Sequence, residues 1–170
     1  ELRLHFEKIR DSATAIEFDY AIDIPFLSGA LVEAQDDIRD AMAIAESVAG
    51  NHRPHIRIVD TTTPGEYAAE KISESIASLV ALGHELNRRG IALSVEHAKQ
   101  PWHVFWEVFV EARQRCGDDY LKLCFDPANF ALALEMPRLL EVESIMPIEV
   151  ISMFHVKQSD GPRITTSLGD

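Results

Sequence analysis

Ionisable side chains directly follow several apolar runs of this sequence, at the points where strands would end. They are Asp60 after HIRIV (55–59), Glu96 and His97 after IALSV (91–95), Asp126 after LKLCF (121–125), and His155 after VISMF (150–154). Carboxylate oxygens and imidazole nitrogens together suit a divalent metal ion such as Mn²⁺, Mg²⁺, Co²⁺ or Zn²⁺. The carboxyl ends of parallel strands form the ligand-binding face in α/β proteins. The pattern therefore predicts a divalent-metal site.

Each of these residues has a more ordinary role when it is taken alone. A strand-end aspartate such as Asp126, which Pro-Ala-Asn follows, more often forms a turn or caps a helix than binds a metal. A single histidine is more often a surface or core residue. Glu96 is harder to explain in this way, because it extends an apolar run and is followed by His97. The recurrence in successive units favours a shared site.

The apolar runs alternate with longer amphipathic segments. Their starts lie about 30 to 35 residues apart, which is the length of one strand with its crossover helix. An earlier run, AIEFDYAI (15–22), is a further candidate strand. The alternation predicts an α/β fold with parallel strands. Because no linker or low-complexity segment divides the chain, residues 1–170 are expected to be a single domain or part of one.

Helices are predicted between these strands. The segment TPGE begins one of them, because Thr63 can cap it, Pro64 suits its first turn and Glu66 completes a capping box. This helix is expected to end at Arg88-Arg89-Gly90, where a basic last turn precedes a glycine. Apolar residues at helical spacing predict three more helices, over 34–48, 102–116 and 137–146.

Composition limits the possible functions. The chain has 170 residues, of which 46% are hydrophobic, and a formal net charge of -12. Such a charge repels nucleic acid and anionic membranes, so neither is expected as a partner. No apolar stretch approaches the roughly 20 residues that span a bilayer, and no segment has the pattern of a signal peptide. The two cysteines, Cys116 and Cys124, indicate reduced thiols and a cytoplasmic protein, with Cys124 as a small buried residue in its strand.

Three segments carry a resemblance to a known family. GIALSVEHA, LKLCFDPANF and ISMFHVKQ, in this order, resemble motifs of the sugar phosphate isomerase/epimerase family, the xylose-isomerase-like TIM barrels. In that family one strand ends in Glu, another in an Asp motif, and another in His-x-Lys-Asp. The tail TTSLGD is similar to the start of a Leu-Gly-Asp/Glu-Gly segment. The resemblance covers most of the chain from about residue 30 onward, and its ordered set is more specific than any one motif.

The resemblance implies roles for individual residues. Glu96, Asp126 and His155 match the metal ligands of the family, and Lys157 matches a basic position near the substrate. Asn129 stands where several members have a substrate-contacting histidine, and His97 stands where an asparagine is common. Gln158 replaces a common aspartate, and Arg163 is a further candidate for substrate binding. These departures concern the identity of the substrate more than the metal.

The implied activity is isomerisation or epimerisation of a sugar, a sugar phosphate or a related polyol. The metal would hold neighbouring carbonyl and hydroxyl oxygens of the substrate, and Glu96 would move the proton next to the carbonyl. Two alternatives stay open. One is a metal-dependent phosphodiesterase like the family's abasic-site endonucleases, which the negative charge disfavours. The other is a barrel remnant that binds without catalysis.

The length departs from the family pattern. A complete (β/α)8 barrel needs about 250 residues, whereas this sequence supplies five strands that correspond to about the third to the seventh. The family's fourth ligand, a glutamate of the eighth strand, has no counterpart here. A partial barrel or a fragment is therefore expected. Its two open sheet edges predict pairing with more chain or with a second copy, so a homo-oligomer is expected.

Overall fold

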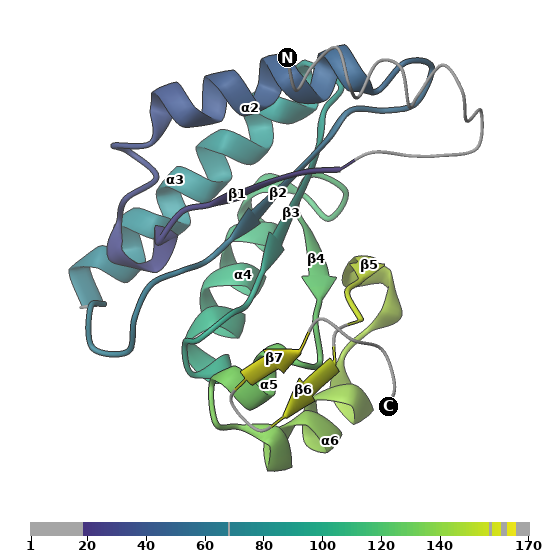
Figure 1. Ribbon diagram of the computed structural model, residues 1–170. Helices are drawn as coiled ribbons and strands as arrows, with labels where there is room; N and C mark the ends of the chain where they lie inside the picture. The colour runs from purple at the N-terminus through teal and green to yellow at the C-terminus, as the bar shows by residue number, and fades with distance from the viewer. Residues whose placement is uncertain (1–18, 68, 157, 161–162, 166–170) are drawn as a thin grey trace.

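A computed structural model of the chain describes residues 19–67, 69–156, 158–160 and 163–165 (Figure 1). Five parallel strands form one sheet in the order β1-β2-β3-β4-β5. A mixed α/β fold with a parallel sheet was predicted and is confirmed. The strands are β1 (Tyr20–Asp23), β2 (His55–Val59), β3 (Ala92–Glu96), β4 (Lys122–Phe125) and β5 (Ile151–Phe154).

Helices connect consecutive strands of this sheet. Because the order in space follows the order in sequence, each connection leads to the adjacent strand, and the sheet has no point where the winding reverses. Figure 1 shows α2, α3 and α4 on one side of the sheet. The helices are α2 (Gln35–Val48), α3 (Ala69–Arg88), α4 (Trp102–Cys116), α5 (Asn129–Leu132) and α6 (Met136–Ile145), with single 3₁₀ turns at η1 (Phe26–Ser28) and η2 (Ile148–Val150).

The two faces of the sheet differ in polarity. Leu93 and Val95 of β3 belong to the hydrophobic core, together with Phe105 and Phe109 of α4. Ser94 and Glu96, which alternate with them in the sequence, lie on the opposite face because side chains alternate along a strand. Arg57 of β2 and Cys124 of β4 likewise alternate with core residues. The sheet therefore has an apolar face toward the helices and a second face that carries polar groups.

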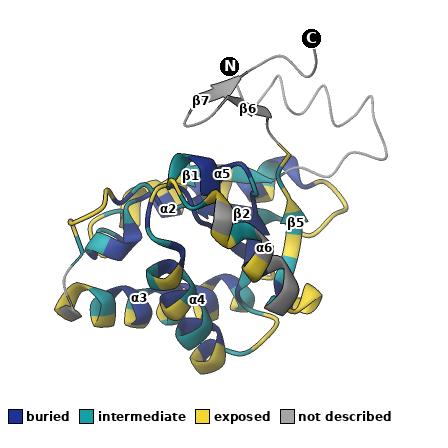
Figure 2. Cartoon of the chain, turned by 90° about the horizontal axis from the view of Figure 1, so that it is seen from below, coloured by how far each residue is buried: buried dark blue, intermediate teal, exposed yellow. Residues whose placement is uncertain are grey.

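The edge strands are less buried than the central ones. Every residue of β3 from Leu93 to Glu96 is buried, whereas exposed residues alternate with half-buried ones in β1 and β5. Figure 2 shows this difference between β2 and β5. Within the described residues, β1 pairs only with β2 and β5 only with β4.

The predicted start of α3 is wrong. Glu66 does accept a hydrogen bond from the backbone N–H of Thr63, at 3.0 Å, as in a capping box. Gly65, however, has φ +95°, which no α-helix contains, so the chain turns here and the helix is described from Ala69. The other predicted helices match α2, α4 and α6.

A short antiparallel pair that was not predicted from the sequence follows β5, formed by β6 (Gln158–Asp160) and β7 (Arg163–Thr165). Of the candidate strand 15–22, the part before residue 19 lies outside the described residues. No helix in the described parts of the chain is both long and apolar enough to cross a membrane.

Candidate metal centre

Glu96 is the last residue of β3, and its side chain is almost completely buried on the polar face of the sheet. Both of its carboxylate oxygens accept hydrogen bonds from neighbouring residues. Oε1 accepts a hydrogen bond from Asn129 Nδ2 at 2.9 Å, and Oε2 accepts one from the guanidinium of Arg57. Hydrogen bonds from these donors stabilise the charged carboxylate at a site that excludes most water.

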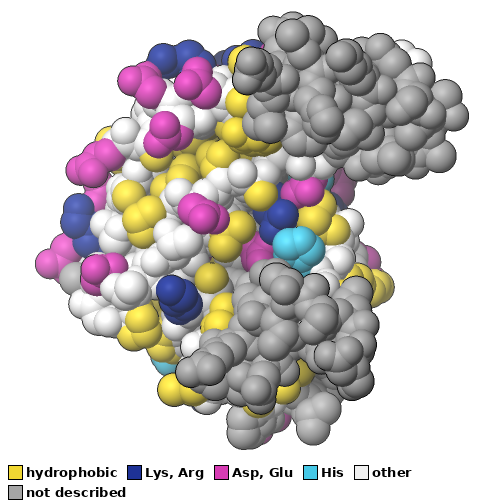
Figure 3. All heavy atoms as spheres, in the orientation of Figure 1, with side chains coloured by type: hydrophobic (Ala, Val, Ile, Leu, Met, Phe, Trp, Pro, Cys, Tyr) yellow, Lys and Arg dark blue, Asp and Glu magenta, His cyan; other side chains and the backbone are white. Residues whose placement is uncertain are grey.

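Asp126 and His155 lie at the same end of the sheet as Glu96. Asp126 directly follows β4, and His155 directly follows β5. The Nδ1 atom of His155 is 3.5 Å from Glu96 Oε2 and 3.6 Å from Asp126 Oδ2. The predicted convergence of these three side chains at the carboxyl ends of parallel strands is therefore confirmed. In the face that Figure 3 shows, a histidine lies next to acidic and basic side chains near the end of β4.

Asp126 also has the turn role that was weighed against metal binding. Its Oδ1 accepts the backbone N–H of Ala128 at 3.0 Å, and its backbone carbonyl accepts the N–H of Asn129 at 3.1 Å. The turn uses Oδ1, while Oδ2 faces His155. One carboxylate therefore both forms the turn and takes part in the cluster.

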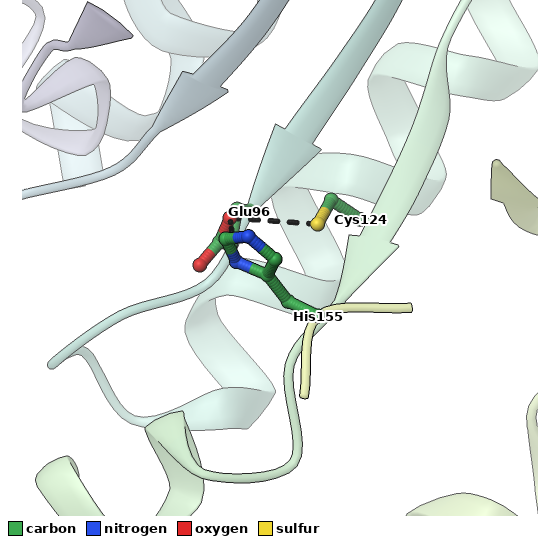
Figure 4. A group of neighbouring side chains, drawn as sticks. All are labelled: Glu96, Cys124 and His155. Atoms are coloured by element: carbon green, nitrogen blue, oxygen red, sulfur yellow. Dashed lines mark hydrogen bonds and ion pairs between the residues drawn. The ribbon is translucent and has the colours of Figure 1, made fainter. Parts of the chain in front are cut away.

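Cys124, which was predicted only as a small buried residue of its strand, also joins this cluster. Its thiol donates to Glu96 Oε2 with a separation of 3.4 Å (Figure 4). Candidate ligand atoms of Glu96, Cys124 and His155 all lie within 4.8 Å of one another, so this group could hold a metal ion. Burial and the negative charge of Glu96 raise the pKa of the Cys124 thiol above its usual range. The protonated thiol is a hydrogen-bond donor, and only its thiolate is a strong metal ligand.

Arg57 brings a positive charge into the same cluster. It lies in the middle of β2, and its side chain reaches toward the carboxyl ends of the strands. Besides its bond to Glu96, its Nε donates to Asp19 Oδ2 at 2.7 Å. Burial lowers the pKa of Arg57, but the hydrogen bonds and negative charges of Asp19 and Glu96 outweigh this effect, so the pKa is raised above its ordinary value.

Asn129 and His97, both predicted to contact a substrate, are buried next to Glu96. Asn129 donates to Glu96 Oε1 and to the backbone carbonyl of His97, at 2.7 Å for the second bond. The His97 ring packs among Trp102, Phe105 and Phe130, and its Nε2 is 2.6 Å from the carbonyl of Gln100. Burial lowers the pKa of His97, which favours the neutral form of the ring. These surroundings favour supporting roles for both residues over contact with a substrate.

Asp60 follows β2 at the same end of the sheet, but its Oδ1 atom bonds within its own loop. Its Oδ1 accepts from the backbone N–H of Thr62 at 3.1 Å and from the Thr62 hydroxyl at 2.7 Å. Complete burial raises its pKa to about 6, although the hydrogen bonds from Thr62 oppose this shift. The backbone N–H of Asp60 donates to the carbonyl of Glu96, which joins the two strand ends.

The remaining predicted residues cannot be placed at the cluster. Lys157 lies outside the described residues, and so does most of the TTSLGD tail. Arg163 begins β7, where the backbone but not the side chain is described. The predicted substrate contacts of Lys157 and Arg163 stay predictions.

Comparisons of the chain with family models, with curated proteins and with solved structures found no match. The resemblance to the sugar isomerases therefore depends on the motifs alone.

Proposed function

We propose that this chain is the central part of a TIM-barrel-type enzyme, a divalent-metal-dependent isomerase or epimerase of a sugar, a sugar phosphate or a related polyol. Two features of the fold support the barrel. Sequential parallel strands with α2, α3 and α4 on one side match the winding of a barrel wall. The polar face of Arg57, Ser94 and Glu96 would then be the interior, with the ionisable groups at the carboxyl ends of the strands.

One observation carries the proposed activity. Glu96, Asp126 and His155 come from three adjacent strands, and their side chains meet within 3.5 to 3.6 Å of the His155 Nδ1 atom. Two carboxylates and an imidazole are a suitable donor set for Mn²⁺, Mg²⁺, Co²⁺ or Zn²⁺. The burial of Glu96 and Asp126 fits a cation as well, because buried carboxylates require a positive partner.

Each residue of the cluster would have a distinct role in this reaction. A bound divalent ion would polarise neighbouring carbonyl and hydroxyl oxygens of the substrate. Glu96 would accept the proton from the carbon next to the carbonyl. Asn129 and Arg57 fix the orientation of its carboxylate, and the aromatic packing around His97 supports the loop that follows β3. Water is largely excluded there, since Glu96 and Asn129 are buried.

Solvent exchange tests this proposal directly. The chain would be incubated with Mg²⁺, which is diamagnetic, in D2O with ketopentoses, ketohexoses and their phosphates, and proton NMR would follow the C–H signal next to the carbonyl. We expect loss of that signal with at least one sugar. Glu96→Gln should slow the loss by on the order of a hundredfold, because the amide cannot accept the proton.

Glu107→Gln is the matched control, since Glu107 is exposed on α4 and the substitution removes the same charge. It should leave the exchange rate unchanged. A chain that binds Mn²⁺ through Glu96 but exchanges no sugar proton would argue against the isomerase and leave a binding domain.

That second candidate, a barrel remnant without catalysis, is favoured by one observation. Arg57 already supplies a positive charge to Glu96, so the chain's own residues balance part of the negative charge of the cluster. A remnant of this kind would keep the fold of the site without the reaction.

A further inference from the structure

Arg57 stands among the groups that would bind the metal. Its Nη1 atom donates to Glu96 Oε2 and lies 3.3 Å from His155 Nδ1. The residue is only 8% exposed, so the guanidinium belongs to the interior of the cluster rather than to its surface. One nitrogen of Arg57 thus contacts two of the three proposed ligands.

These contacts use the same electron pairs that a metal ion would need. Arginine has only donors, so His155 Nδ1 can meet Arg57 only through its lone pair. That lone pair is also the one through which a neutral imidazole coordinates a metal. The electron pairs of Glu96 Oε2 are also in use, because this atom accepts hydrogen bonds from both Arg57 and Cys124.

Arg57 and a divalent ion exclude each other from this position, because both are positively charged. A guanidinium stays protonated in proteins, so Arg57 cannot leave the site by losing its charge. A divalent ion bound to Glu96 and His155 would lie next to this positive group in a buried setting, where screening by water is weak. The guanidinium would have to move away, and its bond from Nε to Asp19 gives it a second anchor.

We propose that Arg57 is an internal cation that competes with the divalent ion for Glu96 and His155, and that metal binding requires its Nη1 atom to withdraw from Glu96 toward Asp19. This inference depends on the proposed metal site. It predicts that the native chain binds its ion more weakly than its donor set would allow.

The test measures Mn²⁺ affinity by electron paramagnetic resonance of the free ion, which needs no catalytic activity. Arg57→Gln should bind Mn²⁺ about tenfold or more tightly than the native chain, because the competing charge is gone. Arg53→Gln is the matched control. It removes the same charge four residues away, where Arg53 donates to the carbonyls of Gly90 and Ile91, and should change the affinity less than about twofold.

Arg57→Lys guards against a glutamine variant that does not fold. Lysine keeps a buried positive charge but lacks the fork that reaches both Asp19 and Glu96. It should bind Mn²⁺ about threefold or more tightly than the native chain, with circular dichroism as the check on folding.

The outcomes separate this inference from the proposed function. Unchanged or weaker affinity in the folded Arg57 variants, with binding still lost in Glu96→Gln, overturns the competition but keeps the metal site. Tight binding only after Arg57 is replaced supports the competition and makes the native chain a metal-free remnant. No binding in any variant overturns both.

Discussion

Asn129 fixes the carboxylate of Glu96 through its hydrogen bond to Oε1, while its second bond holds the carbonyl of His97. Partners that orient a ligand in this way typically contribute 10- to 100-fold to metal affinity. We therefore expect Asn129→Ala to weaken Mn²⁺ binding about tenfold, as measured by equilibrium dialysis. The exposed turn residue Asn51 provides the control, Asn51→Ala, which should have no effect. A lower melting temperature with unchanged affinity would mean that Asn129 only forms the turn.

Asp60 should make the stability of the protein depend on pH. Its pKa rises from 3.8 to about 6 on folding. Between these two pH values, the native state therefore keeps a proton that the unfolded state loses. The free energy of unfolding should then fall by roughly 2–3 kcal/mol as pH rises from about 4 to about 6, and this contribution should be constant above that. Asp60→Asn should remove this decrease, because an amide does not titrate in this range, and its oxygen can still accept the hydrogen bonds from Thr62.

Urea unfolding at several pH values checks this expectation. The control is Asp40→Asn, an exposed substitution on α2 that should leave the decrease intact. Parallel curves for the native chain and Asp60→Asn would assign the pH dependence to other groups.

Strand-end position was the signal that identified Glu96, Asp126 and His155, and it has a physical limit. Arg57 lies in mid-strand, and only its long side chain brings its charge to the site, so a search of strand ends passes over it. Cys124 was interpreted as a packing residue, which its burial agrees with, but its register opposite Glu96 brings its thiol into the cluster. Register between strands is a tertiary property that a single sequence does not contain.

At the level of elements, α3 packs against α4 through a glycine. A Cβ built on Gly83 would lie 3.4 Å from the Sγ atom of Cys116, which leaves room for one methyl group and little more. Gly83→Ala should therefore raise the free energy of unfolding by up to about 1 kcal/mol, because alanine favours the helix. Gly83→Val should lower it by roughly 1–3 kcal/mol, because its branches overfill the interface. Urea unfolding compares the two, and equal destabilisation would mean that the interface accepts no side chain at all.

Periodicity predicted the long elements better than their ends. The helices α2 and α4 follow apolar spacing and match the predictions within a residue. The capping signals at Thr63 and Glu66 were real, but they form an isolated turn because Gly65 takes a left-handed conformation. The pair β6 and β7 was missed because strands of three residues carry almost no periodic signal.

For the whole molecule, the open question is whether further strands complete the sheet that carries the cluster. The five strands form a continuous wall with ionisable groups at one end, while the described residues leave β1 and β5 with a partner on one side only. Apolar spacing could predict the number of these strands, but not whether the sheet closes, since closure depends on the twist and tilt of all strands together. The proposed barrel therefore requires further strands or a second copy.

The second possibility, pairing with a second copy of the chain, can be tested by measuring self-association. Large apolar side chains are exposed just before and just after β5 in the sequence, where Ile148 is 66% and Val156 is 81% exposed. Unpaired strand edges favour pairing between copies. We expect sedimentation velocity to show a mass above the 19.0 kDa of one chain that rises with concentration. The double variant Ile148→Lys with Val156→Lys should shift the population to monomer, because lysines beside an edge strand oppose pairing. Val32→Lys, which changes an exposed apolar residue just before α2, should not. A single species of one chain at every concentration would mean that the edge of β5 is not an association surface.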